Sequence, residues 1–248
     1  MSELYNFPDD FYAIDIGMHD GKDSEYYAKR GFRVIAFEAN TSLIPEAKNR
    51  LLSLQDNVEI RNLAISDVEG DIEFHVNKER TQWSSIDPEI ASRGHQTEII
   101  RVKGCDLSVE LQDIQNRIHM LKIDIEGFDL VALKQVAKLA HKPKYISVEN
   151  GGEKFIEVLS DMGYTRYKYS NQKYTRFHVI PKNSEHGRTV NHKFQDHSSG
   201  AFGNDLIGRW LTLGEAIRVT KALDAARSAA PNNLFAESVG WFDLHATE

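Results

Sequence analysis

Cysteine is almost missing from this chain of 248 residues: Cys105 is the only one, which excludes an internal disulfide. No apolar run approaches the roughly 20 residues that a membrane-spanning helix needs. The opening residues, MSELYNFPDD, contain neither the basic nor the apolar stretch of a secretory leader. We therefore expect a cytoplasmic protein with no membrane span.

An excess of positive charge is also absent. Lys and Arg number 30 against 37 Asp and Glu, which gives a formal net charge of −7. Nucleic-acid binding needs concentrated basic side chains near the phosphates, and the sequence has no basic stripe, so we expect no nucleic-acid partner. Hydrophobic residues make up 41% of the chain, enough to build a full core.

Residues 11–40, FYAIDIGMHDGKDSEYYAKRGFRVIAFEAN, follow the pattern of strand, glycine turn, helix and strand. Gly17 and Gly21 come directly after the first apolar strand, where a missing Cβ lets a ligand approach the backbone. Glu38 ends the second strand, about 20 residues further on, where nucleotide-binding sheets present an acid to the ribose hydroxyls. This stretch predicts half of a nucleoside-binding parallel sheet.

The same turn limits the kind of nucleoside. Its spacing is GxxxG and lacks the third glycine of the dinucleotide pattern GxGxxG. Asp20 would repel a diphosphate, and Asp15 suits a ligand that carries an amine. These residues favour a nucleoside with a zwitterionic amino-acid tail, which describes S-adenosylmethionine, over NAD.

A second informative stretch is 118–129, IHMLKIDIEGFD. Strands inside a parallel sheet are normally apolar on both faces, yet Lys122, Asp124 and Glu126 occupy alternate positions and so share one side. The carboxyl ends of such strands are where open α/β sheets bind ligands. We expect the three side chains to line a site; an ion pair that only fastens the strand end is the alternative.

Acidic residues close several predicted strands, and in a doubly wound sheet those ends converge on one crevice. These residues are Asp15, Glu38, Asp124 and Glu149. Further along, residues 164–169 and 176–180 predict an antiparallel hairpin that ends at Pro181. We therefore expect residues 1–181 to form a ligand-binding domain.

The remainder, residues 182–248, predicts a linker or active-site flap followed by a helical extension. The histidines of its polar first part are expected to be solvated loop residues rather than metal ligands: His186, His192 and His197. A helical stretch from about residue 206 should break near 213 and resume to 228, because Thr212 and Glu215 fit a capping box. The aromatic tail around Trp241 and Phe242 favours docking on the core over sugar stacking.

In these motifs the chain resembles the FkbM family of S-adenosylmethionine-dependent methyltransferases. The segments DIGMHDGKDS, VIAFEAN, NLAISDVEGDIEF and LKIDIEGFDLVAL, with the later strand ISVE, occur in matching order over about residues 11–181. The resemblance implies a class I methyltransferase (Rossmann-like) fold: an α/β architecture with a seven-stranded, mostly parallel sheet and an antiparallel last strand. To this the sequence adds a C-terminal helical appendage.

The implied activity is O-methylation of a sugar, surface glycan or natural-product hydroxyl, as in polysaccharide biosynthesis. Two late segments, SGAFGNDL and GWFDLHA, resemble those of some surface-glycan members, which suggests a substrate-lid role for the extension. The acceptor itself and a homo-oligomeric state stay open.

Carried over residue by residue, the resemblance implies a cofactor site and a methyl-transfer site. Its cofactor residues are Asp15, Gly17, His19, Gly21 and Ser24 at the methionine part, Glu38 at the ribose, and Ala39, Asn40 and Ala64 at the adenosine. Lys122, Asp124 and Glu126 would face the transferred methyl group. The chain has His19 where the family commonly has Asn, and Asn40 where it often has Pro.

Methyl transfer from a sulfonium needs a positioned acceptor and a group that removes its proton. Glu126 or Asp124 could be that base, and Lys122 could orient the acceptor. Asp124 could instead hold the cofactor's ammonium, or form a Mg²⁺ site with Glu149, which we do not expect. A non-catalytic binding module is a second hypothesis. An NAD-dependent oxidoreductase is less favoured because the GxxxG turn and the KIDIEG strand count against it.

Overall fold

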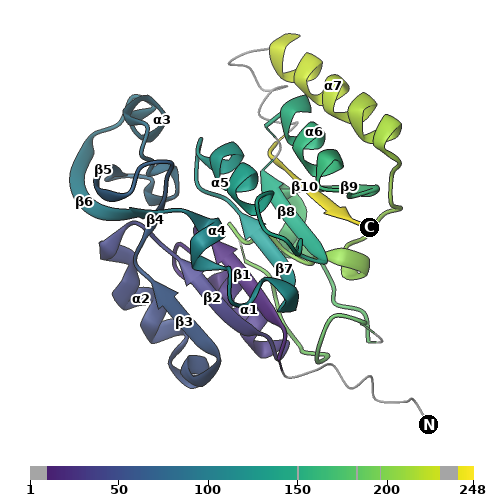
Figure 1. Cartoon of the computed structure of the whole chain (residues 1–248), viewed down its shortest axis with the longest axis horizontal. Coiled ribbons are helices and arrows are strands. Elements are labelled where there is room, and N and C mark those ends of the chain that lie inside the picture. Colours follow the sequence, from purple (N-terminus) through teal and green to yellow (C-terminus); the bar gives the residue numbers. More distant parts are fainter. Residues whose placement is uncertain (1–9, 150, 183, 196, 230–239) are drawn as a thin grey trace.

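The computed structural model describes residues 10–149, 151–182, 184–195, 197–229 and 240–248. Its main sheet has seven strands in the order β3-β2-β1-β7-β8-β10-β9 (Figure 1). They are β1 (Tyr12–Ile16), β2 (Arg33–Phe37), β3 (Val58–Arg61), β7 (Ile118–Ile123), β8 (Tyr145–Glu149), β9 (Arg166–Asn171) and β10 (Phe242–Thr247). Strand β10 runs antiparallel to both of its neighbours, and the pairs among β3, β2, β1, β7 and β8 are parallel. The predicted sheet is confirmed.

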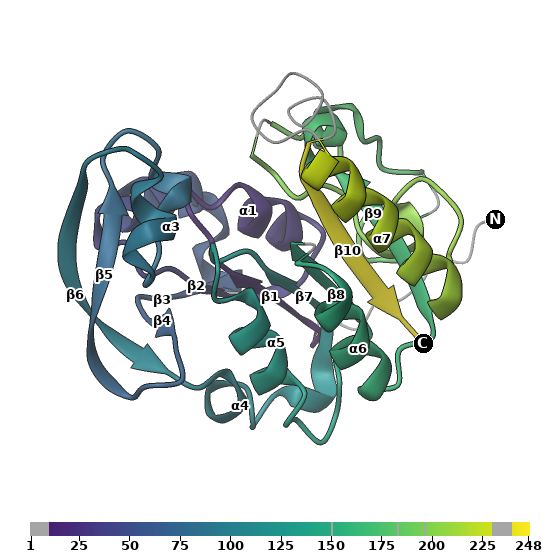
Figure 2. The same cartoon turned by 90° about the horizontal axis from the view of Figure 1, so that it is seen from above.

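Helices cover both faces of this sheet (Figure 2). One face carries α1 (Lys22–Lys29) and α2 (Ile44–Arg50), and the other carries α4 (Leu107–Glu110), α5 (Asp129–Val136), α6 (Glu153–Asp161) and α7 (Leu213–Ala229). Short 3₁₀ turns are η1 (Thr41–Leu43), η2 (Leu52–Asn57), η3 (Thr81–Trp83), η4 (Gln115–Arg117), η5 (Gln172–Phe177) and η6 (Gly203–Asp205). Within the described ranges, no helix has the length and apolar character needed to cross a membrane.

Strand alternation divides the core into two layers. Successive strand residues point to opposite faces, so Ala13 joins the core beneath α1 whereas Ile14 joins the core beneath α5. All residues of β7 are buried. The ionisable Lys122 therefore lies in a strand with no solvated face.

A second, smaller sheet stands beside the β3 end of the main one (Figure 2). It has the order β4-β6-β5, formed by β4 (Ala64–Ile65), β5 (Gly70–Asn77) and β6 (Thr97–Cys105). The connection between β5 and β6 contains η3 and α3 (Pro88–Ser92). Its small core of Ala64, Phe74 and Val102 fixes this connection beside the carboxyl ends of the main strands.

The predicted strand at residues 176–180 is wrong: its first two residues belong to the 3₁₀ turn η5, and residues 178–180 form neither helix nor strand. The antiparallel partner of β9 is instead β10, near the end of the chain, and β10 lies between β8 and β9. Pairing between segments so far apart leaves no local turn signal in the sequence. The region after residue 181 thus supplies a strand of the main sheet as well as helix α7.

Residues 184–195 and 197–206 pack against the face that carries α1. Arg30 of α1 is fully buried, and its guanidinium donates to Asp205 at 2.9 Å and to Ser184 and His186. His186 is only 1% exposed, so its expected solvation is wrong. The apolar neighbours Phe194 and Phe202 in the same core explain why a segment that reads as polar is packed.

The region before α7 also differs from its prediction. No helix begins at residue 206; the chain forms η6 and then α7 from Leu213. The capping box is confirmed: the Thr212 N–H donates to Glu215 Oε2 at 2.9 Å, and the Glu215 N–H donates to Thr212 Oγ1 at 3.4 Å. The box starts this helix instead of restarting an earlier one.

Candidate active site

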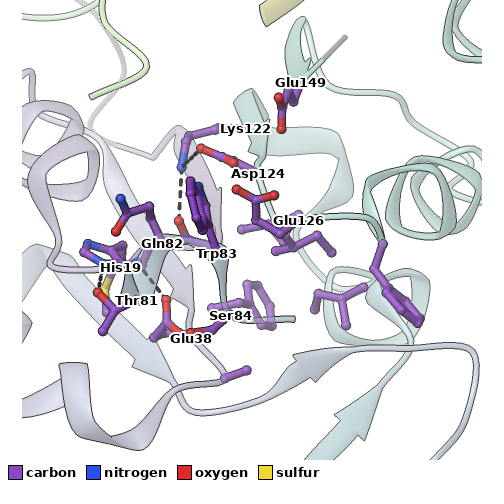
Figure 3. A pocket seen from close by; sticks show the side chains of 18 of the residues that line it. His19, Glu38, Thr81, Gln82, Trp83, Ser84, Lys122, Asp124, Glu126 and Glu149 are labelled. Atoms are coloured by element: carbon purple, nitrogen blue, oxygen red, sulfur yellow. Dashed lines mark hydrogen bonds and ion pairs between the residues drawn. The ribbon is translucent and has the colours of Figure 1, made fainter. Parts of the chain in front are cut away.

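A pocket opens at the carboxyl ends of the central parallel strands (Figure 3). Three parts of the chain form its walls. The main sheet contributes Gly17, His19, Glu38, Lys122, Asp124, Glu126 and Glu149; the β5–β6 connection contributes Thr81, Gln82, Trp83 and Ser84; and the late chain contributes Gln172, His197 and Trp241.

The glycine turn after β1 forms the floor of the pocket. Gly17 has φ +82, and a Cβ there would lie 1.8 Å from the carbonyl oxygen of Asp124. The exit of β7 therefore passes directly against this turn, and a residue with a side chain does not fit. His19 follows with φ 54, and its ring bonds Thr81 Oγ1 at 2.8 Å. The turn and the β5–β6 connection are thus joined across the pocket.

Glu38 fixes the shape of this turn. Its Oε2 accepts the backbone N–H of His19 and its Oε1 accepts that of Asn40, each at 2.7 Å. A carboxylate has about four acceptor positions, so each oxygen keeps capacity for a further donor. Burial raises the pKa of Glu38, and the two backbone donors oppose part of that shift. A ligand with two adjacent hydroxyls matches this free acceptor pair.

Lys122 ties the ends of β1 and β7 together beneath the pocket. Its Nζ donates to Asp15 Oδ1 and to the Gly17 carbonyl, both at 3.1 Å, and lies 3.7 Å from both Asp23 and Asp124. Burial alone would lower the pKa of Lys122, but the surrounding carboxylates raise it. The amine is thus a fully engaged cation whose main role is to hold this floor.

Carboxyl groups gather at the opposite end, where β7 and β8 finish and the antiparallel β10 begins. Burial, followed by repulsion from Asp124, raises the pKa of Glu126 to about 7 and that of Glu149 to about 9. Asp243 pairs with Glu149 across β10 and β8, and burial raises its pKa to about 8. Near neutral pH this end of the pocket can therefore take up or release protons.

The predicted site residues fall into two groups. Nine of them line the pocket: Gly17, His19, Glu38, Ala39, Ala64, Lys122, Asp124, Glu126 and Glu149. The others lie behind its wall. Asp15 accepts from Ser24 Oγ at 2.6 Å, Gly21 is the N-cap of α1, and Asn40 Oδ1 caps η1 by accepting from Ser42 N at 3.1 Å. They support the turn from beneath.

Sequence reasoning missed the walls that come from outside the main sheet. Thr81, Gln82 and Trp83 belong to a segment that reads as a polar loop, in which the aromatic Trp83 is the signal that was available. Trp241 lines the pocket and is 50% exposed, whereas the residues after it form β10. The end of the tail joins the main sheet as β10, whereas Trp241 stays half exposed at the pocket instead of docking on the core.

The described part of the chain contains no group of three or more His, Cys, Asp or Glu side chains arranged to hold a metal ion.

A profile of the family described as the methyltransferase FkbM domain matches residues 15–195. A search among curated proteins finds no match. Among solved structures, geranyl diphosphate C-methyltransferase from Streptomyces coelicolor A3(2), in complex with Mg²⁺, geranyl diphosphate and S-adenosyl-L-homocysteine, is similar with a TM-score of 0.43 and 8% identity, over 96% of this chain and 72% of that one. Precorrin-6y C5,15-methyltransferase from Geobacter metallireducens GS-15 has a TM-score of 0.40 and 15% identity, over 67% and 69% of the two chains.

Proposed function

Because the chain belongs to the FkbM methyltransferase family, we propose that it methylates a hydroxyl of a sugar, surface glycan or natural product, with S-adenosylmethionine as the methyl donor. When bound, this cofactor supplies a methyl group that is already activated on a sulfonium. The chain must then hold the cofactor, position the acceptor and take its proton.

The residues of the pocket fit such a cofactor. The bare backbone at Gly17 gives close access beside the floor, and Glu38 offers two carboxylate oxygens to the ribose hydroxyls. Ala39 and Ala64 provide small apolar surfaces for the adenosine. Asp124 lies on the pocket wall near the glycine turn, where a carboxylate attracts an ammonium or sulfonium charge.

The observation that carries the proposal is the Glu126 carboxyl group, which lines the same pocket with a pKa of about 7. A base for a hydroxyl acceptor works best when its pKa lies close to the working pH. We therefore assign Glu126 as the group that takes the acceptor's proton and Asp124 as a cofactor-binding residue. Lys122 keeps a supporting role, because its amine is bonded to Asp15 and Gly17.

Replacement of Glu126 tests this assignment. Glu126→Gln keeps the size of the side chain and removes the base, so turnover should fall by about 10² or more. Binding of S-adenosylhomocysteine, measured by calorimetry, should stay unchanged. Release of S-adenosylhomocysteine in the presence of methyl glycosides measures turnover, and Glu153→Gln on the surface of α6 is the matched control. Undiminished turnover in Glu126→Gln would remove it from this role.

A further inference from the structure

Strained backbone is concentrated at this pocket. Among the described residues, the non-glycine positions with positive φ are His19, Arg93, Glu126 and His197, at 54°, 39°, 46° and 68°. This conformation is unfavourable for residues with a Cβ, and it persists where surrounding contacts enforce it, most often at functional sites. Three of these residues line the pocket. The fourth, Arg93, forms an ion pair with one of the three, Glu126.

The β5–β6 connection holds the turn that contains Glu126 from outside the main sheet. Ser85 Oγ donates to the Glu126 carbonyl at 2.6 Å. A Cβ added to Gly127 would lie 2.3 Å from Cδ1 of Ile90 in α3, so helix and turn are in tight contact. Both the backbone and the following glycine are therefore positioned by residues 85–90.

Arg93 extends the same brace to the carboxylate. It is the left-handed C-cap of α3, and its guanidinium donates to Glu126 Oε2. The same guanidinium lies 5.1 Å from the ring centroid of Trp83, which lines the pocket. The Glu126 side chain is only 16% exposed, against 35% for Arg93, so the pair connects the pocket wall to the solvent side.

We propose that Arg93 is a positioning residue for Glu126: the ion pair between these two left-handed turns holds the carboxylate at the pocket wall and favours its ionised form. This role rests on the proposed function, in which Glu126 takes the proton of the acceptor hydroxyl. Only the ionised carboxylate can accept that proton. Arg93 itself touches neither acceptor nor cofactor in this role.

The charges around Glu126 show why a nearby cation matters. Burial is the largest influence and raises its pKa. Two carboxylates raise it further, Asp124 after β7 and Asp129 at the start of α5. Glu149 at the end of β8 also faces Glu126, and there the influence is on Glu149, whose pKa Glu126 helps to raise. Arg93 acts in the opposite direction through both its charge and its hydrogen bond. Without this guanidinium, the carboxyl group should stay protonated to a higher pH.

The test is the titration of Glu126 in the cofactor-free protein, followed by NMR of ¹³C-labelled glutamate carboxyl groups. The resonance that disappears in Glu126→Gln is assigned to the Glu126 carboxyl group. Arg93→Met should raise the titration midpoint by about 1 to 3 pH units, the usual effect of removing an opposite charge at this distance. Arg93→Lys, which restores a positive charge, should bring the midpoint part of the way back.

Arg80→Met is the matched control, because the Arg80 guanidinium also covers Trp83, at 4.6 Å from the ring centroid. It should leave the Glu126 midpoint in place. An unchanged midpoint in Arg93→Met, with native binding of S-adenosylhomocysteine as proof of folding, would overturn the proposal. A midpoint in Arg93→Lys equal to that of Arg93→Met would overturn it as well. In the active protein, the acid limb of the pH profile of kcat/KM should shift to higher pH by the same amount as the Glu126 midpoint.

This outcome is separable from the proposed function. The NMR titration concerns the free protein and reports the ion pair whether or not a hydroxyl is methylated. A wild-type protein that binds S-adenosylhomocysteine but methylates amines instead of hydroxyls would contradict the proposed acceptor class and leave the titration result standing.

Discussion

Asp243 illustrates how the position of one residue determines its charge. It lies on β10, is 2% exposed, and its Oδ1 accepts from Gln172 Nε2 at 2.6 Å. Its Oδ2 has no hydrogen-bond partner among the residues that the structure describes. Burial, with repulsion from Asp124, raises its pKa from 3.8 to about 8. Asp243 is therefore mainly protonated at neutral pH, a state that its place in the sequence does not indicate.

This pKa makes the stability of the protein depend on pH. Between about pH 4 and pH 8 the folded protein holds a proton on Asp243 that the unfolded chain has released. The stabilisation is complete below pH 4 and disappears as the pH rises through 8. Asp243→Asn has no such proton, so its free energy of unfolding should exceed the wild-type value by an amount that grows from pH 5 to pH 8. Urea unfolding at each pH measures the difference, and parallel curves would refute the shift.

The site residues that could be predicted are those at the ends of apolar strands. Glu38, Asp124, Glu126 and Glu149 were recognisable because parallel strands bring their carboxyl ends to one edge. Trp83 and Arg93 were not, because their position depends on how the small sheet stands beside the large one. That arrangement comes from packing among Ala64, Phe74 and Val102, which has no local signature.

At the scale of elements, the contact between the turn after β1 and the exit of β7 forms the centre of the site. Gly17 has positive φ, and its α-carbon faces the Asp124 carbonyl without room for a methyl group. Gly70, at the start of β5, also has positive φ but has nothing within 4 Å of the added Cβ. A comparison of substitutions at the two glycines therefore distinguishes the cost of backbone strain from the cost of steric overlap.

Alanine at each glycine should show that separation. Gly70→Ala should reduce the free energy of unfolding by about 1 to 2 kcal/mol, the cost of a left-handed conformation. Gly17→Ala should lose that amount plus about 1 to 3 kcal/mol for the overlap with β7, and cofactor binding with it. Urea titration and calorimetry test both. Equal losses of unfolding free energy in the two variants would mean that the turn and the exit of β7 move apart at little energetic cost.

Element prediction succeeded where the signal is local and failed where it is not. Strands β1, β2 and β7 follow from apolar runs, and α7 begins at the predicted capping box. The hairpin assigned to residues 164–180 was wrong, because β9 finds its partner in β10 instead of the adjacent segment. The family resemblance implied an antiparallel last strand, but neither that resemblance nor periodicity placed the strand near the chain end.

At the scale of the whole molecule, the late chain is part of the main sheet and of the pocket wall. Strand β10 lies inside the main sheet, and the buried ion pair between Arg30 and Asp205 fixes the segment around Asp205 against α1. His197 and Trp241, which both follow residue 181, line the pocket. The two segments that meet at residue 181 in the sequence therefore share one sheet, because β10 lies between β8 and β9.

The most direct test of this account is calorimetric titration of the purified protein with S-adenosylhomocysteine. The wild type should bind, and Glu38→Ala should bind at least about tenfold more weakly, because each charge-assisted hydrogen bond lost is worth about 1.5 to 3 kcal/mol. Glu59→Ala, which removes an exposed acid of the neighbouring strand β3, should bind like the wild type. A folded wild-type protein that does not bind S-adenosylhomocysteine would contradict the account.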